Sequence, residues 1–297
     1  MDNYFNVDLI KQVQPVITKS DVDVMKRLIE SIEEAENTLE SDSKVSDHQI
    51  AKDIAFMKDL IQQLNRVEKS TSEIIRDRIV AAGSKFHANS NISAFIEEGE
   101  IDELINECTE AFEKVLDCLV IDRENDPNSI DTPRRLAKMY ILETMSGRYN
   151  EAPKVTAFPN THTQRTDGYN GLLVVRSELR SLCSHHHQPV TGVAYIGIIP
   201  KGDVIGLSKY TRLAQFAAKR GTLQEELAAD IAELIQTHSG SEDVAVYIEA
   251  EHGCCTNRGI MAHNSTTQTT VLKGEFMTDP AVRKEFHDNI SLQKMQK

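Results

Sequence analysis

Two short segments of this chain combine cysteine and histidine in a pattern that can bind a metal ion. The first runs from Cys183 to His187 with the sequence CSHHH, and the second runs from His252 to Cys255 with the sequence HGCC. Zinc prefers cysteine sulfur and histidine nitrogen, and a catalytic zinc takes three protein ligands and leaves one position for water. Cys183, His186 and one cysteine of the second segment would complete such a set.

Each segment alone has an ordinary structural explanation, because a histidine run can be a solvated turn and paired cysteines can be buried apolar side chains. Both segments, however, fall at the ends of predicted strands, where pairing within a sheet would bring them together. The strand-like runs are LLVVRSEL (172–179), GVAYIGIIP (192–200), VAVYIEAEH (244–252) and STTQTTVLKG (265–274). Together the two segments favour a metal site.

Helical segments separate these strands. One helix is predicted from Thr132, with Pro133 near its first position and Gly147 closing it, and another from about Lys209 to His238. Pairs of strands separated by long helices predict an α+β domain, in which an antiparallel sheet carries helices on one face.

The first part of the chain is acidic and helical. Residues 1–120 hold 25 acidic and 13 basic side chains, whereas residues 121–297 hold 21 and 20. Apolar residues recur at helical spacing from Ser20 to about Leu39, from Ser46 to Ile79, where Ala81 to Ser84 reads as a stop, and from Ile92 to Val120. We therefore predict an acidic helical extension over 1–100, either a packed hairpin or a surface for a protein partner, and a catalytic domain over 101–297.

The charge and hydropathy patterns exclude several classes of protein. An acidic surface without basic runs would repel nucleic-acid phosphates, so no nucleic-acid role is expected. The sequence has no apolar stretch of about 18 residues and no secretory signal at its first residues. We expect no membrane association and a cytoplasmic location.

Several motifs occur in an order that resembles the GTP cyclohydrolase I family. They are TPRRLAKMY (132–140), C-x-H-H (183–186), VIGLSK (204–209), QEEL (224–227), H-x-C-x-x-x-R-G (252–259), and the later STTQTT and GEF. The resemblance covers about residues 110–288. It implies that Cys183, His186 and Cys254 bind zinc, and that Cys255 is a neighbour of the site.

The resemblance also implies the activity. The zinc would activate a water molecule that attacks C8 of GTP, after which formate leaves and the product rearranges to 7,8-dihydroneopterin triphosphate. His185 and His252 would shuttle protons, or would orient other groups, and Ser208 would assist the ribose rearrangement.

Matching positions in the family bind the substrate. Arginine donates bidentately to phosphate, and a carboxylate can accept from both N1–H and the 2-amino group of guanine. The resemblance assigns the triphosphate to four cations and the guanine base to Glu225 with Gln224 beside it. The four cations are Arg135, Lys209, Arg212 and Arg258.

The implied architecture is the tunnelling fold, in which subunits join their antiparallel sheets into a barrel. The implied assembly is a homodecamer of two pentamers, with active sites between subunits. The product would enter tetrahydrofolate and one-carbon metabolism, pterin cofactor synthesis or deazaguanine synthesis.

Two positions depart from the family pattern. Ser184 stands where the family has glutamate in C-E-H-H, and Glu226 stands where it has arginine in Q-E-R. These departures bear on the rate and the exact substrate and do not touch the proposed metal ligands. Two rival functions also stay open. One is a related nitrile reductase that acts on a deazapurine with NADPH, and the other is a catalytically weakened regulator that binds a purine or a pterin.

Overall fold

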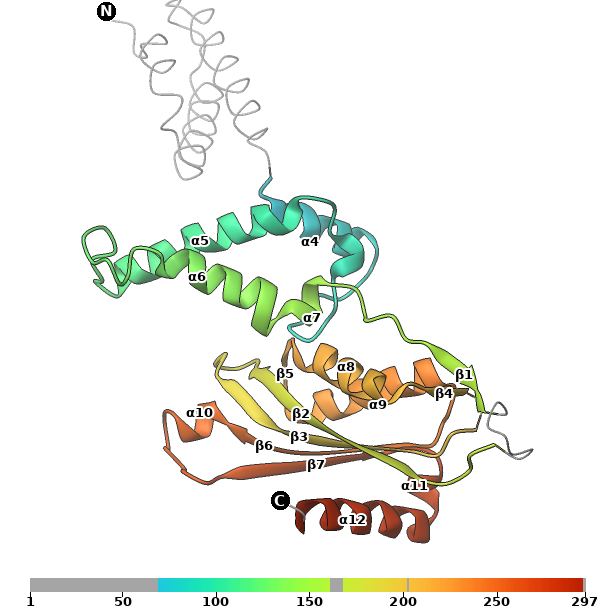
Figure 1. Cartoon of the computed structure of the whole chain (residues 1–297). Coiled ribbons are helices and arrows are strands. Elements are labelled where there is room, and N and C mark those ends of the chain that lie inside the picture. Colours follow the sequence, from blue (N-terminus) through green and yellow to red (C-terminus); the bar gives the residue numbers. More distant parts are fainter. Residues whose placement is uncertain (1–68, 161–167, 202, 296–297) are drawn as a thin grey trace, which may run out of the picture. The chain divides into compact units, whose positions relative to one another are not determined.

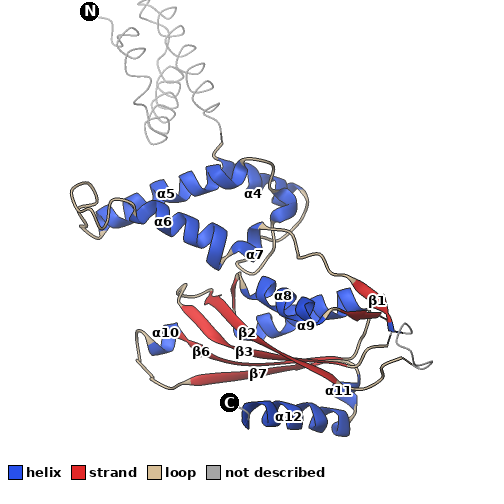
Figure 2. Cartoon of the chain, viewed as in Figure 1, coloured by secondary structure: helices blue, strands red, loops and turns tan. Residues whose placement is uncertain are grey.

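The structure is a computed structural model that describes residues 69–160, 168–201 and 203–295 (Figure 1). The helix predicted from Ser20 to about Leu39, and the part before residue 69 of the one predicted from Ser46 to Ile79, lie outside the described residues. From Thr71 onward the chain forms one compact unit of helices and strands (Figure 2). Within the described residues, no helix combines the length and the apolar character needed to cross a membrane.

A twisted sheet of five strands forms the centre of this unit, in the order β5-β2-β3-β6-β7. Its strands are β2 (Leu173–Cys183), β3 (Pro189–Ile198), β5 (Gly221–Thr222), β6 (Val244–His252) and β7 (Thr266–Leu272). The four long strands pair antiparallel, and β5 adds one short parallel pairing to β2. The strands β1 (Ala157–Pro159) and β4 (Asp203–Ile205) form a separate antiparallel pair. The predicted α+β fold with an antiparallel sheet is confirmed.

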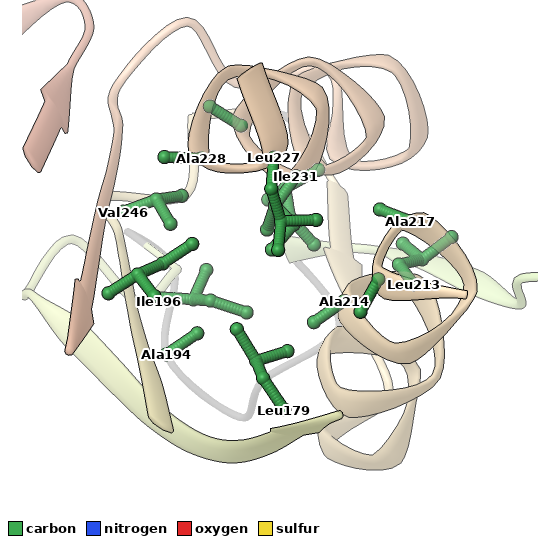
Figure 3. Packing of buried hydrophobic residues seen from close by; sticks show 14 of the residues in the cluster. Leu179, Ala194, Ile196, Leu213, Ala214, Ala217, Leu227, Ala228, Ile231 and Val246 are labelled. Carbon is green, nitrogen blue, oxygen red and sulfur yellow. The ribbon is translucent and has the colours of Figure 1, made fainter. Parts of the chain in front are cut away.

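Two helices cover one face of this sheet, α8 (Leu207–Ala218) and α9 (Gln224–Ser239). Alternate residues of the central strands point into this layer because side chains in a strand alternate between faces. Ala194, Ile196 and Val246 meet the helices there, and small residues such as Ala214 let the backbones approach closely (Figure 3). The result is the main apolar core.

The prediction of one helix from Lys209 to His238 is wrong. The chain leaves the helical conformation after Ala218, pairs Gly221 with Leu182 of β2, and starts a new helix at Gln224. A Cβ atom at Gly221 would lie 3.3 Å from both the Ala88 Cβ and the Met145 Cε atoms, so this segment is packed between other parts of the fold. Tertiary contacts therefore override local helix propensity here.

The opposite face of the sheet also carries a helix, α12 (Pro280–Met295), preceded by the single turn α11 (Glu275–Thr278). Phe286 is fully buried there against Tyr195, Tyr247 and Phe276. Gly197 of β3 lies under its ring, since a Cβ atom at that position would come within 2.8 Å of two ring carbons. The predicted helices on one face are α8 and α9, and α12 is an addition that we did not predict.

A second group of helices precedes the sheet. It comprises α4 (Thr71–Ala81), the 3-10 turn η2 (Ser93–Phe95), α5 (Glu100–Cys118), α6 (Thr132–Lys138), the π-helix η3 (Met139–Thr144) and α7 (Ser146–Tyr149). Ile75 and Ile79 of α4 share a buried cluster with Leu104 and Ile105 of α5. The segment before residue 100 that the structure describes therefore packs with residues that we assigned to the catalytic domain.

Three helix boundaries in this group differ from the prediction. Lys69 and Ser70 are not helical, so the helix predicted from Ser46 to Ile79 is not continuous. The helix expected from Ile92 begins at Glu100. Gly147 lies inside α7, where a Cβ atom would come within 2.1 Å of the Phe216 carbonyl oxygen, so this glycine permits contact with α8.

We expect Phe286→Ala to lower the free energy of unfolding by about 3–5 kcal/mol, because it removes a buried ring and leaves a cavity between α12 and the sheet. Denaturant titration at one fixed protein concentration measures this loss. Lys284→Ala, on the exposed side of the same helix, should change stability by less than about 0.5 kcal/mol. Equal effects of the two substitutions would contradict this account of α12.

Candidate functional site

The cysteine and histidine segments meet at one edge of the sheet. Strand β3 begins between the ends of β2 and β6, with Leu182 opposite Pro189 and Val190 opposite His252. Cys183 is the last residue of β2, and the short helix α10 (Gly253–Thr256) follows β6 directly. The donor atoms of Cys183, His186 and Cys254 consequently lie within 4.8 Å of one another.

A tight turn between β2 and β3 carries His186. The Cys183 amide donates to the Gln188 carbonyl at 2.9 Å, and the His187 amide donates to the Cys183 carbonyl at 2.9 Å. His187 adopts a left-handed conformation with φ of +50°. These hydrogen bonds close the turn, so that the Cys183 sulfur and the His186 imidazole, three residues apart, lie close enough to bind one ion.

The chemistry of this donor set fits a zinc ion. Two thiols and one imidazole are preferred zinc ligands, and three ligands leave a position open. Burial, together with the neighbouring Cys183, raises the pKa of Cys254 to about 11, so the Cys254 thiol is protonated at neutral pH when no metal is bound. A divalent cation would offset this cost by binding the thiolates. Cys255 is exposed, with its Sγ atom 3.9 Å from that of Cys254, and it is not part of the group.

Arg258 lies beside the same histidine, with its Nη1 atom 3.1 Å from Nε2 of His186. A guanidinium group can only donate, so this nitrogen of His186 acts as an acceptor. An unprotonated nitrogen is the form that a metal ligand requires.

His252 is held by a buried amide. Gln224, the first residue of α9, is 3% exposed, and its Nε2 atom donates to the Thr267 carbonyl at 3.0 Å and to Thr269 Oγ1 at 3.1 Å. Its Oε1 atom lies 2.7 Å from Nε2 of His252. Because the amide donors are already used, Oε1 accepts a hydrogen bond from the Nε2–H group, and Nδ1 of His252 is left as the basic nitrogen.

The surroundings also set the charge of His252. Burial lowers its pKa, and the carboxylate of Glu225 opposes this shift, so Glu225 lies within electrostatic reach of the ring. His252 is therefore neutral at neutral pH, and it can accept a proton there.

The remaining predicted residues lie on the surfaces around this edge and on α6 and α8. His185 is exposed, with its ring centroid 6.4 Å from that of His186. Ser208 is exposed in the first turn of α8, and Lys209 donates from Nζ to the Lys154 carbonyl at 3.0 Å. Glu225 is exposed next to the buried Gln224.

Two of the arginines predicted to bind the triphosphate lie among residues other than the metal-site group in this chain. Arg212 lines a cavity of about 270 Å³ between α7 and α8. Arg135 lies exposed on α6, where it forms an ion pair with Asp131 at 3.2 Å. The structure thus brings together, at one edge of the sheet, Cys183, Cys254, His186, Arg258, and His252 with its partner Gln224. Arg135 lies instead on α6, in the helical group.

Two features of the site had no clear signal in the sequence. The motif QEEL placed Gln224 beside the base, whereas its side chain is buried and contacts His252. The ring of Tyr140 lies against His187, and nothing in TPRRLAKMY indicates this contact.

Comparison with known proteins agrees with this geometry. A family model described as GTP cyclohydrolase I matches residues 108–291. The GTP cyclohydrolase 1 of Aeromonas salmonicida (strain A449) is 41% identical over 174 residues, which cover 58% of this chain and 77% of the relative. The GTP cyclohydrolase 1 of Aliivibrio fischeri (strain MJ11) is 36% identical over 219 residues, or 73% of this chain and 95% of the relative.

A solved structure of an archaeosine synthase QueF-like protein in the apo form matches 35% of this chain and 93% of its own chain, at 17% identity and a TM-score of 0.30. This likeness is too remote to bear on function. The match over residues 108–291 and the relatives at 36–41% identity are decisive, and the chain belongs to the GTP cyclohydrolase I family. The predicted family and enzyme class are confirmed.

We expect the full-length chain to bind about one equivalent of zinc and Cys254→Ser to lose it, because a hydroxyl is a poor replacement for a thiolate ligand. Cys255→Ser is the matched control, since it removes the adjacent exposed thiol and should keep the metal. Elemental analysis after dialysis measures both. Full zinc occupancy in Cys254→Ser, or loss in Cys255→Ser, would contradict the proposed ligand set.

Proposed function

We propose that this chain is a zinc-dependent enzyme that hydrolyses GTP at C8, releases formate and forms 7,8-dihydroneopterin triphosphate. The observation that carries the proposal is the meeting of Cys183, His186 and Cys254 at one sheet edge. These three residues would hold the ion, which, when bound, supplies Lewis-acid activation of water.

His252 and His185 are proposed to move protons during ring opening. His252 is kept neutral by burial, and Gln224 fixes its tautomer so that Nδ1 can accept a proton. His185 is exposed beside His186 and can exchange protons with solvent. The two histidines thus differ in environment, as a base and an exchangeable acid would.

Glu225 is proposed to bind the guanine base. It lies exposed in the first turn of α9. Its carboxylate could accept from N1–H and the 2-amino group together. The amide of Gln224 is already hydrogen-bonded within the protein, so we propose that Gln224 positions His252 and the start of α9 and does not contact the base.

Lys209, Arg212, Arg258 and Arg135 are proposed to bind the triphosphate, with Ser208 assisting the ribose rearrangement. Lys209 and Arg258 contact neutral partners, a carbonyl and an imidazole. Phosphate oxygens form stronger, charge-assisted hydrogen bonds and would replace these partners.

A homodecamer of two pentamers is proposed as the active assembly, with sheets joined into a barrel. Strand β7 is an outer strand of the sheet, and its residues Thr266–Gln268 are exposed. An unpaired strand edge is suited to adding a strand from another copy. We further propose a cytoplasmic location, a product used for folate, pterin or deazaguanine synthesis, and a protein partner for residues 1–100.

Incubating the chain with GTP should yield equal amounts of formate and dihydroneopterin triphosphate, and a zinc chelator should abolish both. Fluorescence of the oxidised pterin and enzymatic formate detection are the measurements. If the chain binds GTP but releases no formate at high enzyme concentration, the result would instead support the rival function of a catalytically weakened regulator. Consumption of NADPH with a deazapurine nitrile would support the reductase.

Glu225→Gln should lower kcat/KM for GTP by about 100-fold, because an amide cannot accept both guanine donors and leaves one unpaired. Glu226→Gln is the matched control, since Glu226 is the exposed neighbour in the same helical turn and its change should stay within about twofold. Steady-state kinetics with GTP and ITP separate base recognition from other losses, because ITP lacks the 2-amino group. Equal effects of the two variants would refute the assignment of Glu225.

A further inference from the structure

The third histidine of the CSHHH segment has no part in the site proposed above. His187 closes the turn between β2 and β3 by donating its amide to the Cys183 carbonyl. It does so with φ of +50°, a conformation that residues other than glycine rarely adopt. Such a backbone persists only when surrounding contacts hold it in place.

The side chain of His187 is exposed, and a row of aromatic rings contacts it from one side. The Tyr140 ring lies 5.4 Å from the His187 ring, centroid to centroid, and 5.6 Å from the Phe112 ring, with which it is stacked at 12°. Phe112 belongs to α5 and Tyr140 to the π-helix, so the row connects two helices to the turn. Ring pairs at these separations stabilise one another beyond simple burial.

The π-helix places Tyr140 in this row. Its wide turn is closed by the Met145 amide, which donates to the Tyr140 carbonyl at 2.9 Å, and by Thr144 Oγ1, which donates to the Met139 carbonyl at 3.1 Å. Ile141, the next residue, is 2% exposed in the apolar cluster of the helices. Short π-helices are rare and are frequent at functional sites.

The same segment also supports the turn from a second side. A Cβ atom at Gly221 of β5 would lie 3.9 Å from the Ser184 Cα atom and 3.3 Å from the Met145 Cε atom. Met145 follows the π-helix directly. Ser184 therefore lies next to Gly221, which packs on Met145, while His187 contacts Tyr140 directly.

We propose that Tyr140 and His187 are positioning residues that hold the turn from Cys183 to Gln188 in its metal-binding shape. This inference rests on the proposed metal site, because the geometry of its ligands is what the stack would fix. Groups that orient metal ligands commonly change metal affinity by about 10- to 100-fold when they are removed. The contact needs an aromatic ring at both positions and makes no use of the tyrosine hydroxyl or of the imidazole nitrogens.

The test is zinc affinity of the full-length chain, measured by competition with a chromogenic chelator. Tyr140→Ala and His187→Ala should each weaken zinc binding by about tenfold. The double variant should be little weaker than either single variant, because the two residues act through one contact. Tyr140→Phe keeps the ring and should leave affinity within about threefold of the original chain.

Two further variants separate positioning from general stability. Phe95→Ala removes a partly buried ring from the same helical cluster and should lower the melting temperature without changing zinc affinity. His187→Asn tolerates the left-handed backbone without an aromatic ring, and it replaces His187→Ala if that variant does not fold. The Co²⁺ absorption spectrum should change in the Tyr140→Ala and His187→Asn chains and stay unchanged in Phe95→Ala.

The outcomes distinguish this inference from the proposed function. If the original chain binds no zinc, the proposed metal site is refuted, and the positioning role that rests on it is refuted with it. If it binds zinc and the alanine variants bind equally well, or if Phe95→Ala weakens binding as much as they do, the positioning role is refuted. An additive loss in the double variant would show that the two rings act independently, which also contradicts the proposal.

Discussion

The pairing of β3 with β2 on one side and β6 on the other is the constraint on which the site depends. Leu182 opposite Pro189 and Val190 opposite His252 fix where β2 and β6 end relative to β3. Since side chains alternate between faces, a slip of one residue in either pairing would turn the flanking residues to the other face. The apolar residues under α8 and α9 resist such a slip because it would expose them, so packing of the core also holds the two thiols together.

A second constraint is the need to satisfy a buried amide. Gln224 links three elements, because it starts α9, faces His252 at the end of β6, and donates to Thr267 and Thr269 of β7. Leaving any of these polar atoms unpaired in the interior would cost about 1–3 kcal/mol. The same hydrogen bonds that secure β7 against α9 therefore determine which nitrogen of His252 is basic.

The sequence was sufficient where local pattern and chemistry coincide. The strands around Ala194 and Val246 are short apolar runs, and cysteines and histidines stand at their ends, so the sheet and a metal site could be predicted, whereas the choice of Cys254 over Cys255 came from the family resemblance. The break at Gly221 could not, because residues on both sides favour helix and only contacts with Ala88, Met145 and β2 end it. The π-helix and the stack on His187 likewise depend on packing between segments far apart in the chain.

Arg148 of α7 and Arg220, which follows α8, both hold the loop that precedes η2, and Arg220 ties this loop to the sheet domain. Arg148 donates to the Ser90 carbonyl at 2.9 Å, and Arg220 donates to the Asn89 carbonyl at 3.1 Å while its guanidinium lies 4.7 Å from the Phe216 ring centroid. Burial lowers the pKa of both guanidinium groups, yet arginine stays protonated at any working pH. Removing either cation would leave carbonyl groups of the same loop without a donor. Because this loop packs on Gly221, and Gly221 on Ser184, the helices before the sheet belong to the support of the metal turn as much as the strands do.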